Sequence, residues 1–199
     1  YWFELRAATA DHSEGAAVRI DSPAIEVGGD WREIFATSRR VVVGRKLGSF
    51  LADRRWFRGK ARTIQAVHMV DRVTLETEAT EGSSVELVFF QVEYTEGEPE
   101  RYLAPFSFAE EERAREIESD DPGAVLCRLR LRDAVGDERD GIVYDAMRED
   151  AVIQSLLQIV AGERRLPTQL GSLVGRQTSR FAELRGDEPR LPSSMLKVE

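Results

Sequence analysis

Alternating hydrophobic and polar residues indicate a run of β-strands in the middle of the chain. The alternation is clearest in residues 85–89 and 125–131, where a period of two places apolar side chains on one face and Glu or Arg on the other. Short turns rich in Gly, Asp and Pro separate the apolar segments. The sequence therefore predicts an antiparallel meander with one apolar face and one face in solvent, built from strands at residues 63–77, 85–94, 101–106, 125–131 and 142–146.

Apolar residues at helical spacing precede and follow these strands. One region begins at Trp31, and its spacing of i, i+3 and i+4 recurs at Leu47, while the other occupies residues 148–161 and stops at Gly162. An apolar sheet face requires a cover, so we expect the helix that carries Leu47 to pack against it. The second helix has a broad apolar face, and we expect it to be buried on more than one side, as a joint to a further unit from residue 167 onwards. The fold class is thus α+β, with a curled antiparallel β-sheet wrapped on a helix.

Residues 6–30 are rich in Ala, Gly, Asp and Ser without a sustained period, which is typical of a linker. Within this segment, residues 17–20 and 24–27 could each form a short edge strand before Pro and Gly interrupt the pairing. The chain starts in a strand-like segment at residues 1–5 and stops just after the apolar-rich residues 195–198. We therefore expect a fragment of a longer protein.

Charge is distributed unevenly along the 199 residues. Subtracting 36 acidic from 28 basic side chains gives a net charge of −8, which argues against a general nucleic-acid binder because that role needs a cationic surface. Residues 31–62 nevertheless hold ten basic side chains against two acidic ones, whereas residues 76–121 hold fifteen acidic against three basic. We expect these two halves to attract each other, with little effect on stability because exposed pairs are screened.

The cysteine content and the hydropathy indicate the cellular environment in which the protein is expected. The single cysteine, Cys127, can form neither an internal disulfide nor a multi-thiolate metal site, which fits a reducing, cytoplasmic environment. No apolar stretch approaches the ~20 residues that cross a bilayer, so we expect no contact with a membrane.

Candidate catalytic residues are sparse. Neither His12 nor His68 is followed two residues later by an aspartate, and no GxGxxG, GxxxxGK[ST], HExxH or GxSxG pattern occurs. We interpret His68 as a strand residue, Cys127 as a small apolar filler in the core, and residues 171–175 as an ordinary glycine turn. The acidic runs at residues 110–112, 120–121 and 137–138 are interpreted as solvated loops. The sequence therefore predicts no catalytic, cofactor-binding or metal-binding residue in this chain.

The most specific segment is residues 53–64, DRRWFRGKARTI, at the exit from a helix into the first long strand. Trp56 and Phe57 supply bulky anchors, and Gly59 would permit a left-handed turn after the helix. Lys60 and Arg62 would favour the negative end of the helix. On these grounds the segment is a structural junction.

This segment resembles the N-terminal signature of the cap domain of bacterial maltokinases. Residues 92–94 and 101–105 resemble the next strand pair of that family, and Tyr144-Asp145-Ala146 before the helix resembles its entry into the intermediate subdomain. Residues 171–173 match a later landmark, and residues 1–5 are similar to the last strand of trehalose synthases, which are fused to maltokinase in many bacteria. The implied organisation is a trehalose synthase tail and linker at residues 1–30, the cap domain at residues 31–140, and an incomplete start of the intermediate subdomain at residues 141–199.

The resemblance implies a parent enzyme that uses ATP and magnesium to phosphorylate maltose to maltose 1-phosphate, feeding α-glucan synthesis. The family's fold resembles aminoglycoside phosphotransferases, with a cystatin-like cap before the nucleotide lobe. Its phosphate loop, ATP-contacting lysine and catalytic lobe would lie beyond Glu199, so Lys197 does not take the role of that lysine. We therefore expect a noncatalytic portion that needs no cofactor of its own and whose partners are the remaining kinase lobes and, in a fusion, the trehalose synthase domain.

Two other classes of function are compatible with the sequence. One is a stand-alone interaction module that uses the basic region at residues 31–62, or an open sheet edge, to bind an acidic partner. A reading frame that continues on both sides of the chain would favour the fragment over the module. A small independent enzyme ranks below both, because no nucleophile and base pair is visible.

Overall fold

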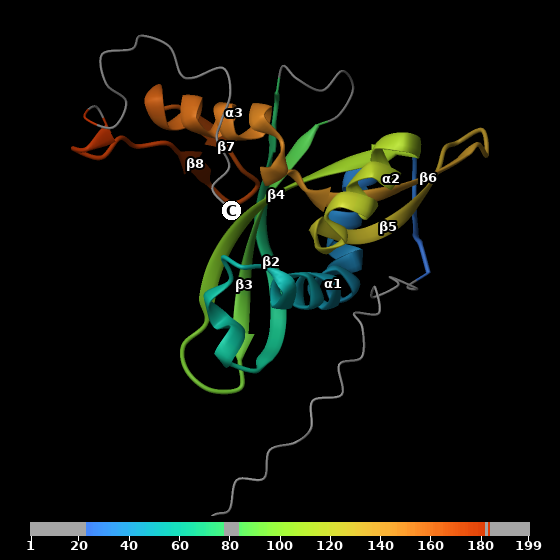
Figure 1. The fold of residues 1–199 in the computed structure, drawn as a ribbon, viewed down its shortest axis with the longest axis horizontal. Coiled ribbons are helices and arrows are strands. Elements are labelled where there is room, and N and C mark those ends of the chain that lie inside the picture. Colours follow the sequence, from blue (N-terminus) through green and yellow to red (C-terminus); the bar gives the residue numbers. More distant parts are fainter. Residues whose placement is uncertain (1–22, 78–83, 182, 184–199) are drawn as a thin grey trace, which may run out of the picture.

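In the described part of the chain, a curled sheet of six strands forms the centre of the fold (Figure 1). The computed structural model describes residues 23–77, 84–181 and 183. The strands lie in the order β1-β5-β6-β4-β3-β2, and β7 and β8 form a separate small hairpin. The strands are β1 (Ile25–Val27), β2 (Ile64–Leu75), β3 (Val85–Tyr94), β4 (Glu100–Glu110), β5 (Val125–Arg132), β6 (Glu138–Asp145), β7 (Arg165–Pro167) and β8 (Ser172–Val174), and the α-helices are α1 (Arg40–Asp53), α2 (Glu111–Asp120) and α3 (Asp150–Ala161).

The five predicted strands are all present, but their order is not that of a meander. Strand β6 lies between β4 and β5, because the chain leaves β4 through α2 before it returns as β5. At the far edge, β1 pairs with β5 in parallel, with Ile25 opposite Leu129. The edge strand expected at residues 24–27 is thus confirmed, whereas residues 17–20 lie outside the described part of the chain. The antiparallel pairing predicted for these five strands is confirmed. The predicted meander order was wrong, because strand order depends on pairing between distant segments.

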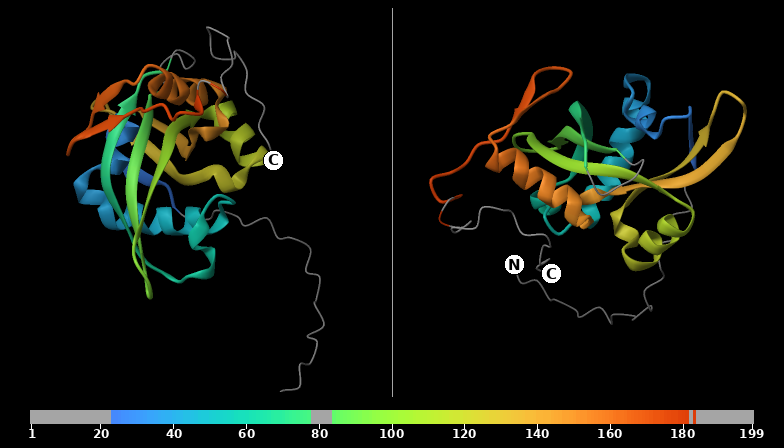
Figure 2. Two further views of the ribbon diagram at one scale, coloured as in Figure 1. Left: turned by 90° about the vertical axis from the view of Figure 1, so that its left-hand side faces the viewer. Right: turned by 90° about the horizontal axis from the view of Figure 1, so that it is seen from above.

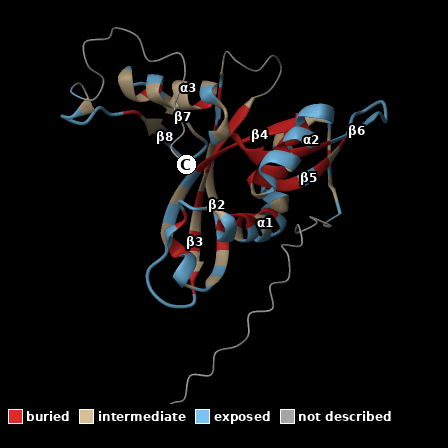
Figure 3. Cartoon of the chain, viewed as in Figure 1, coloured by how far each residue is buried: buried red, intermediate tan, exposed pale blue. Residues whose placement is uncertain are grey.

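Helix α1 covers one face of the sheet, as predicted. However, the β3 residues that pack against it are not the ones whose alternation predicted the strand. Val88, Phe90 and Val92 share a core cluster with Leu47 and Phe50 of α1. The alternating set that predicted the strand points away from α1 and packs instead beneath α3: Val85, Leu87 and Phe89. Both faces of β3 are therefore buried near its start, and the expectation of one solvated face was wrong there (Figure 3).

A β-bulge alters the alternation of β5. The register shifts between Val125 and Cys127, so that Val125 joins the cluster under α2, while Leu126, Cys127 and Leu129 belong to the main core beside α1. The bulge rotates one residue to the other face, which a strict period of two cannot anticipate.

Helix α3 lies over the ends of β2 and β3, on the side of the sheet away from α1 (Figures 1 and 2). The helix predicted at residues 148–161 is confirmed, but only Val152 and Ile159 of this described helix are buried. Leu166 and Leu173 of the β7–β8 hairpin pack against the same cluster. The helix is thus buried along one stripe, and the prediction of burial on several sides is not met by the structure described.

Helix α2 was missed by the sequence analysis. The prediction of solvated loops at residues 110–112 and 120–121 is wrong for Glu111, Glu112 and Asp120, because the first two begin this helix and Asp120 ends it. Only Ala114 and Ile117 are buried, against Ile142 and Tyr144 of the sheet, so the apolar signal was short. Acidic residues in a first turn complement the positive end of a helix, which explains their position.

Candidate functional site

Arg54 joins three segments of the chain at the end of α1. Its guanidinium lies 3.7 Å from Asp121 after α2 and 3.8 Å from Asp145 at the end of β6. It also lies 5.0 Å from the centre of the Phe50 ring. The Arg54 side chain is only 12% exposed, so one partly buried cation connects the ends of α1, α2 and β6.

Asp145 is the most buried partner in this arrangement. Its side chain is 8% exposed and accepts a hydrogen bond from the backbone N–H of Met147 at 3.0 Å, which caps the 3-10 turn Ala146–Arg148. Burial raises the pKa of the Asp145 carboxyl, although that hydrogen bond and the charge of Arg54 oppose the rise. Two segments that carried the maltokinase resemblance, around residues 54–64 and 144–146, therefore meet at the Arg54–Asp145 pair.

Aromatic residues complete the junction. Phe57 is 3% exposed, and its ring centre lies 5.3 Å from that of Tyr102 on β4. Trp56 contacts Tyr102 and Phe50 at 6.0 and 6.5 Å but remains 42% exposed. The predicted anchoring role is confirmed for Phe57, while Trp56 only covers the edge of the cluster.

Glu100 fastens the start of β2 to the β3–β4 hairpin. Its carboxylate accepts hydrogen bonds from the hydroxyls of Tyr94, at 2.9 Å, and Tyr102, and it forms an ion pair with Arg62. The Arg62 guanidinium lies 3.5 Å from the centre of the Tyr94 ring. Hydrogen bonds from Tyr102 and Tyr94 lower the pKa of Glu100, and burial together with Glu100 raises the pKa of Tyr102. The carboxylate is engaged by three groups, an arrangement suited to holding strands together.

Gly59 has a different role from the one predicted. It lies in the 3-10 turn Arg58–Ala61 and does not share the positive φ of Gly97 and Gly136. A Cβ on Gly59 would lie 2.3 Å from the Tyr94 hydroxyl oxygen and 2.5 Å from Cζ of Phe57. Close packing of two rings requires glycine here, and the left-handed turn was a wrong prediction. Arg62 likewise pairs with Glu100 and not with the end of α1.

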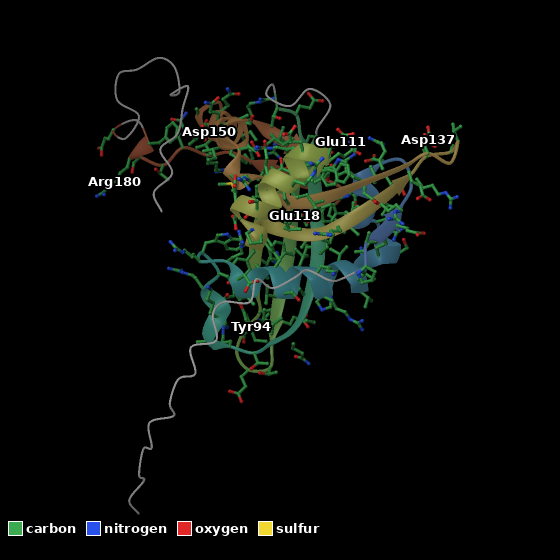
Figure 4. All side chains as sticks on the ribbon, turned by 45° about the vertical axis from the view of Figure 1, so that its right-hand side comes forward. Tyr94, Glu111, Glu118, Asp137, Asp150 and Arg180 are labelled. Carbon is green, nitrogen blue, oxygen red and sulfur yellow. The ribbon has the colours of Figure 1, made fainter. Side chains whose placement is uncertain are left out.

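The remaining candidates of the sequence analysis occupy separate places. His68 lies exposed on β2, with its Nε2 3.4 Å from Glu93, and Cys127 is 1% exposed on β5, so the strand and core interpretations are confirmed. Burial raises the pKa of Cys127 to about 12. Figure 4 places Glu111 on α2 and Asp137 at the tip of the β5–β6 hairpin, far from Tyr94. His12 and Lys197 lie outside the described residues.

The glycines at residues 171–175 lie in a hairpin and not in a phosphate loop. Within residues 23–77, 84–181 and 183, no group of three or more His, Cys, Asp or Glu side chains could hold a metal. Gly171 and Gly175 belong to the β7–β8 hairpin, where the N–H of Thr168 donates to the Gly171 carbonyl and the N–H of Gly175 to that of Arg164. A phosphate loop would need a strand-to-helix turn with free amides, so the interpretation as an ordinary turn is confirmed.

These features define a small α+β domain whose curled sheet wraps one helix and whose junction is held by Arg54, Asp145, Phe57 and Glu100. Residues 50–149, half of the chain, match the family model of the maltokinase N-terminal cap domain, and the chain belongs to this family. Comparison with curated proteins gave no match. Among the helices described, none has the length and apolar character to span a membrane.

Proposed function

We propose that this chain is the noncatalytic cap domain of a maltokinase together with the adjoining start of its intermediate subdomain. A maltokinase phosphorylates maltose to maltose 1-phosphate with ATP. The observation that carries the proposal is the match of residues 50–149 to the cap family, together with the meeting of its characteristic segments at Arg54 and Asp145. The role of the chain in that enzyme is to present a rigid sheet-and-helix unit to the catalytic lobes.

The chemistry and partners of the parent enzyme are part of the same proposal. ATP and magnesium would be bound by the remaining kinase lobes, which are the principal partners of this chain, in a cytoplasmic enzyme of α-glucan metabolism. A trehalose synthase domain would precede the cap in a fusion protein. The proposal assigns neither ATP nor magnesium to any residue of this chain.

Phosphoryl transfer is the direct test. The 199-residue chain is incubated with maltose, ATP and magnesium, and maltose 1-phosphate is measured. No product above a blank without protein is expected, while the same chain joined to the catalytic lobes encoded downstream of it should form product. Product from the chain alone, or a downstream reading frame that encodes no kinase lobe, would overturn the proposal.

A second candidate function is a stand-alone interaction module. Exposed cations of residues 39–60 that form no ion pair with a described residue favour it: Arg40, Arg45, Arg55, Arg58 and Lys60. The flanking gene sequence separates the two candidates, because a module would be encoded alone, and a cap would be followed by a kinase in the same frame.

A further inference from the structure

A cavity of about 540 Å³ lies where segments that are distant in the sequence meet. The turn that follows β1, the end of β4 with the start of α2, the β5–β6 hairpin and the turn before α3 all contribute to its lining. Small-molecule sites typically have volumes of about 300–1,000 Å³. Arg54 and Asp145 do not belong to the lining, so the cavity is distinct from the junction at the end of α1.

The most buried lining residues form an apolar floor. Trp31, Phe108 and Leu131 belong to the main core cluster and are 7%, 9% and 2% exposed. The rings of Trp31 and Phe108 stack, with their centres 6.3 Å apart and their planes at 12°. The floor is therefore part of the packed core, and a ligand would meet it without rearrangement of these side chains.

The walls of the cavity carry equal numbers of carboxylates and guanidiniums. They form three ion pairs: Glu110–Arg139 at 3.0 Å, Glu149–Arg113 at 2.7 Å and Asp30–Arg32 at 2.6 Å. An anion or a cation would be attracted by one half of each pair and repelled by the other. The lining therefore favours a ligand without net charge.

The ion pairs leave hydrogen-bonding capacity unused. A guanidinium has five N–H donors, and a carboxylate accepts at about four lone-pair sites. Among the residues that the structure describes, Arg139 bonds through Nη1 alone, Arg113 leaves Nε unused and Arg32 leaves Nη1 unused. Donors and acceptors therefore stand side by side along the walls.

A neutral sugar matches this combination of walls and floor. Each sugar hydroxyl both donates and accepts, so it can join a carboxylate oxygen and an adjacent N–H while the ion pair stays intact. The C–H groups on the face of a sugar ring can pack on the apolar floor. A zwitterion would also be neutral, but its charges would have to compete with ion pairs that are already formed.

We propose that this cavity is a binding site for a neutral oligosaccharide. Hydroxyl groups of the sugar bond to the Glu110–Arg139 and Glu149–Arg113 pairs, and one ring packs on the floor beside Trp31. The site goes beyond the proposed function and does not depend on it, because sugar binding here needs neither a kinase lobe nor phosphoryl transfer. A chain that failed to belong to a kinase could still bind the sugar, and the reverse also holds.

The test is an NMR titration of the full 199-residue chain with maltotriose, isomaltotriose and cellotriose, which are neutral sugars of different linkage. At least one should shift the indole N–H signal of Trp31, while the signal of Trp56, which lies outside the cavity, stays in place. Salt at about 0.5 M should change the affinity less than about twofold, because the ligand is uncharged. The proposal is overturned by a Trp31 shift no larger than that of Trp56, by loss of binding in salt, or by tighter binding of the zwitterion glycylglycine.

A matched pair of variants locates the site. Arg139→Ala should weaken sugar binding about five- to tenfold, because its hydrogen bonds to the hydroxyls are lost. Arg130→Ala is the control: Arg130 belongs to the same hairpin and pairs with Asp140 at 2.8 Å, but it is not part of the lining, so binding should be unchanged. The two arginine side chains are 55% and 42% exposed, and circular dichroism of both variants should match the unmodified chain. Unchanged binding in Arg139→Ala, or equal weakening by the two variants, would overturn the proposal.

Discussion

Thr168 donates a hydrogen bond from its hydroxyl to the Asp71 carboxylate at 2.5 Å, across 97 positions of the sequence. The backbone N–H groups of Gln169 and Leu170 donate to the same carboxylate at 3.1 and 3.3 Å. One side chain on β2 therefore holds the tip of the β7–β8 hairpin, which follows α3, against the edge of the main sheet. This contact connects the residues matched by the cap family to the segment beyond them.

Removal of the Asp71 carboxylate should release the hairpin. Asp71→Ala is expected to speed amide hydrogen exchange at residues 165–174 and to lower the free energy of unfolding by about 1 kcal/mol, because three hydrogen bonds from the hairpin to a charged group are lost at a partly exposed position. Thr168→Val removes one of the three and should have a smaller effect in the same region. Unchanged exchange in Asp71→Ala would show that the hairpin is held by Leu166 and Leu173 alone.

The same contact should depend on pH. Burial opposes the ionised form of Asp71, but hydrogen bonds from Thr168 and from the N–H groups of Arg72, Leu170 and Gln169 outweigh it and hold the pKa below its ordinary value of 3.8. A lowered acid pKa adds stability above the ordinary value and loses it as pH falls through the lowered one. The NMR signals of the Gln169 and Leu170 amides should therefore stay constant from pH 7 to pH 5 and shift below about pH 4. Asp71→Asn should abolish this shift.

Asp145 and Asp121, which both lie near Arg54, should contribute differently to the free energy of unfolding. Asp145→Ala removes the cap on Met147 and the buried partner of Arg54, and should lower the free energy of unfolding by about 2 kcal/mol in urea denaturation. The side chain of Asp121 is 51% exposed, so Asp121→Ala should lower the free energy of unfolding by only about 0–1 kcal/mol. Equal losses from the two variants would contradict the assignment of Asp145 as the buried partner.

Gly44 and Gly48 on α1 should respond in opposite ways to replacement by Ala, because they differ in the space available for a Cβ. Gly44→Ala would bring a Cβ to 2.3 Å from the Val67 carbonyl oxygen and should destabilise the protein by about 1–3 kcal/mol. A Cβ on Gly48 would meet only Cγ2 of Val67, at 3.8 Å, so Gly48→Ala should stabilise the helix by about 0.5–1 kcal/mol. Thermal denaturation of the two variants should therefore move the melting temperature in opposite directions, and a common direction would contradict the packing.

Cys127 should be unreactive in the folded protein. It is 1% exposed, and burial raises its pKa to about 12, so almost no thiolate is present at neutral pH. A thiol reagent such as dithionitrobenzoate should react slowly with the native chain and fully in denaturant, where the single cysteine gives one equivalent. Rapid reaction in native buffer would show that β5 opens readily.

Some features of the junction at residues 53–64 could be predicted from the sequence, and others could not. The order of aromatic and basic residues in 53–64 indicated a structural junction and the anchoring role of Phe57, both of which depend on local composition. The Arg54–Asp145 pair and the hydrogen bonds of Glu100 to Tyr94 and Tyr102 were not predicted. Arg54 and Asp145 come from segments about half the chain apart, and only the closing of the sheet brings them together.

The pattern of apolar residues by itself determined the five central strands, α1 and α3, and the burial of Cys127, because these features follow from short-range periodicity. The tertiary structure alone decided which side chains of β3 face α1 and which face α3, the position of β6 between β4 and β5, and the parallel pairing of β1. It also decided that Gly59 is needed for the contact between two rings. Each of these outcomes depends on surfaces supplied by distant parts of the chain, and local alternation carries no information about which surface will cover which face.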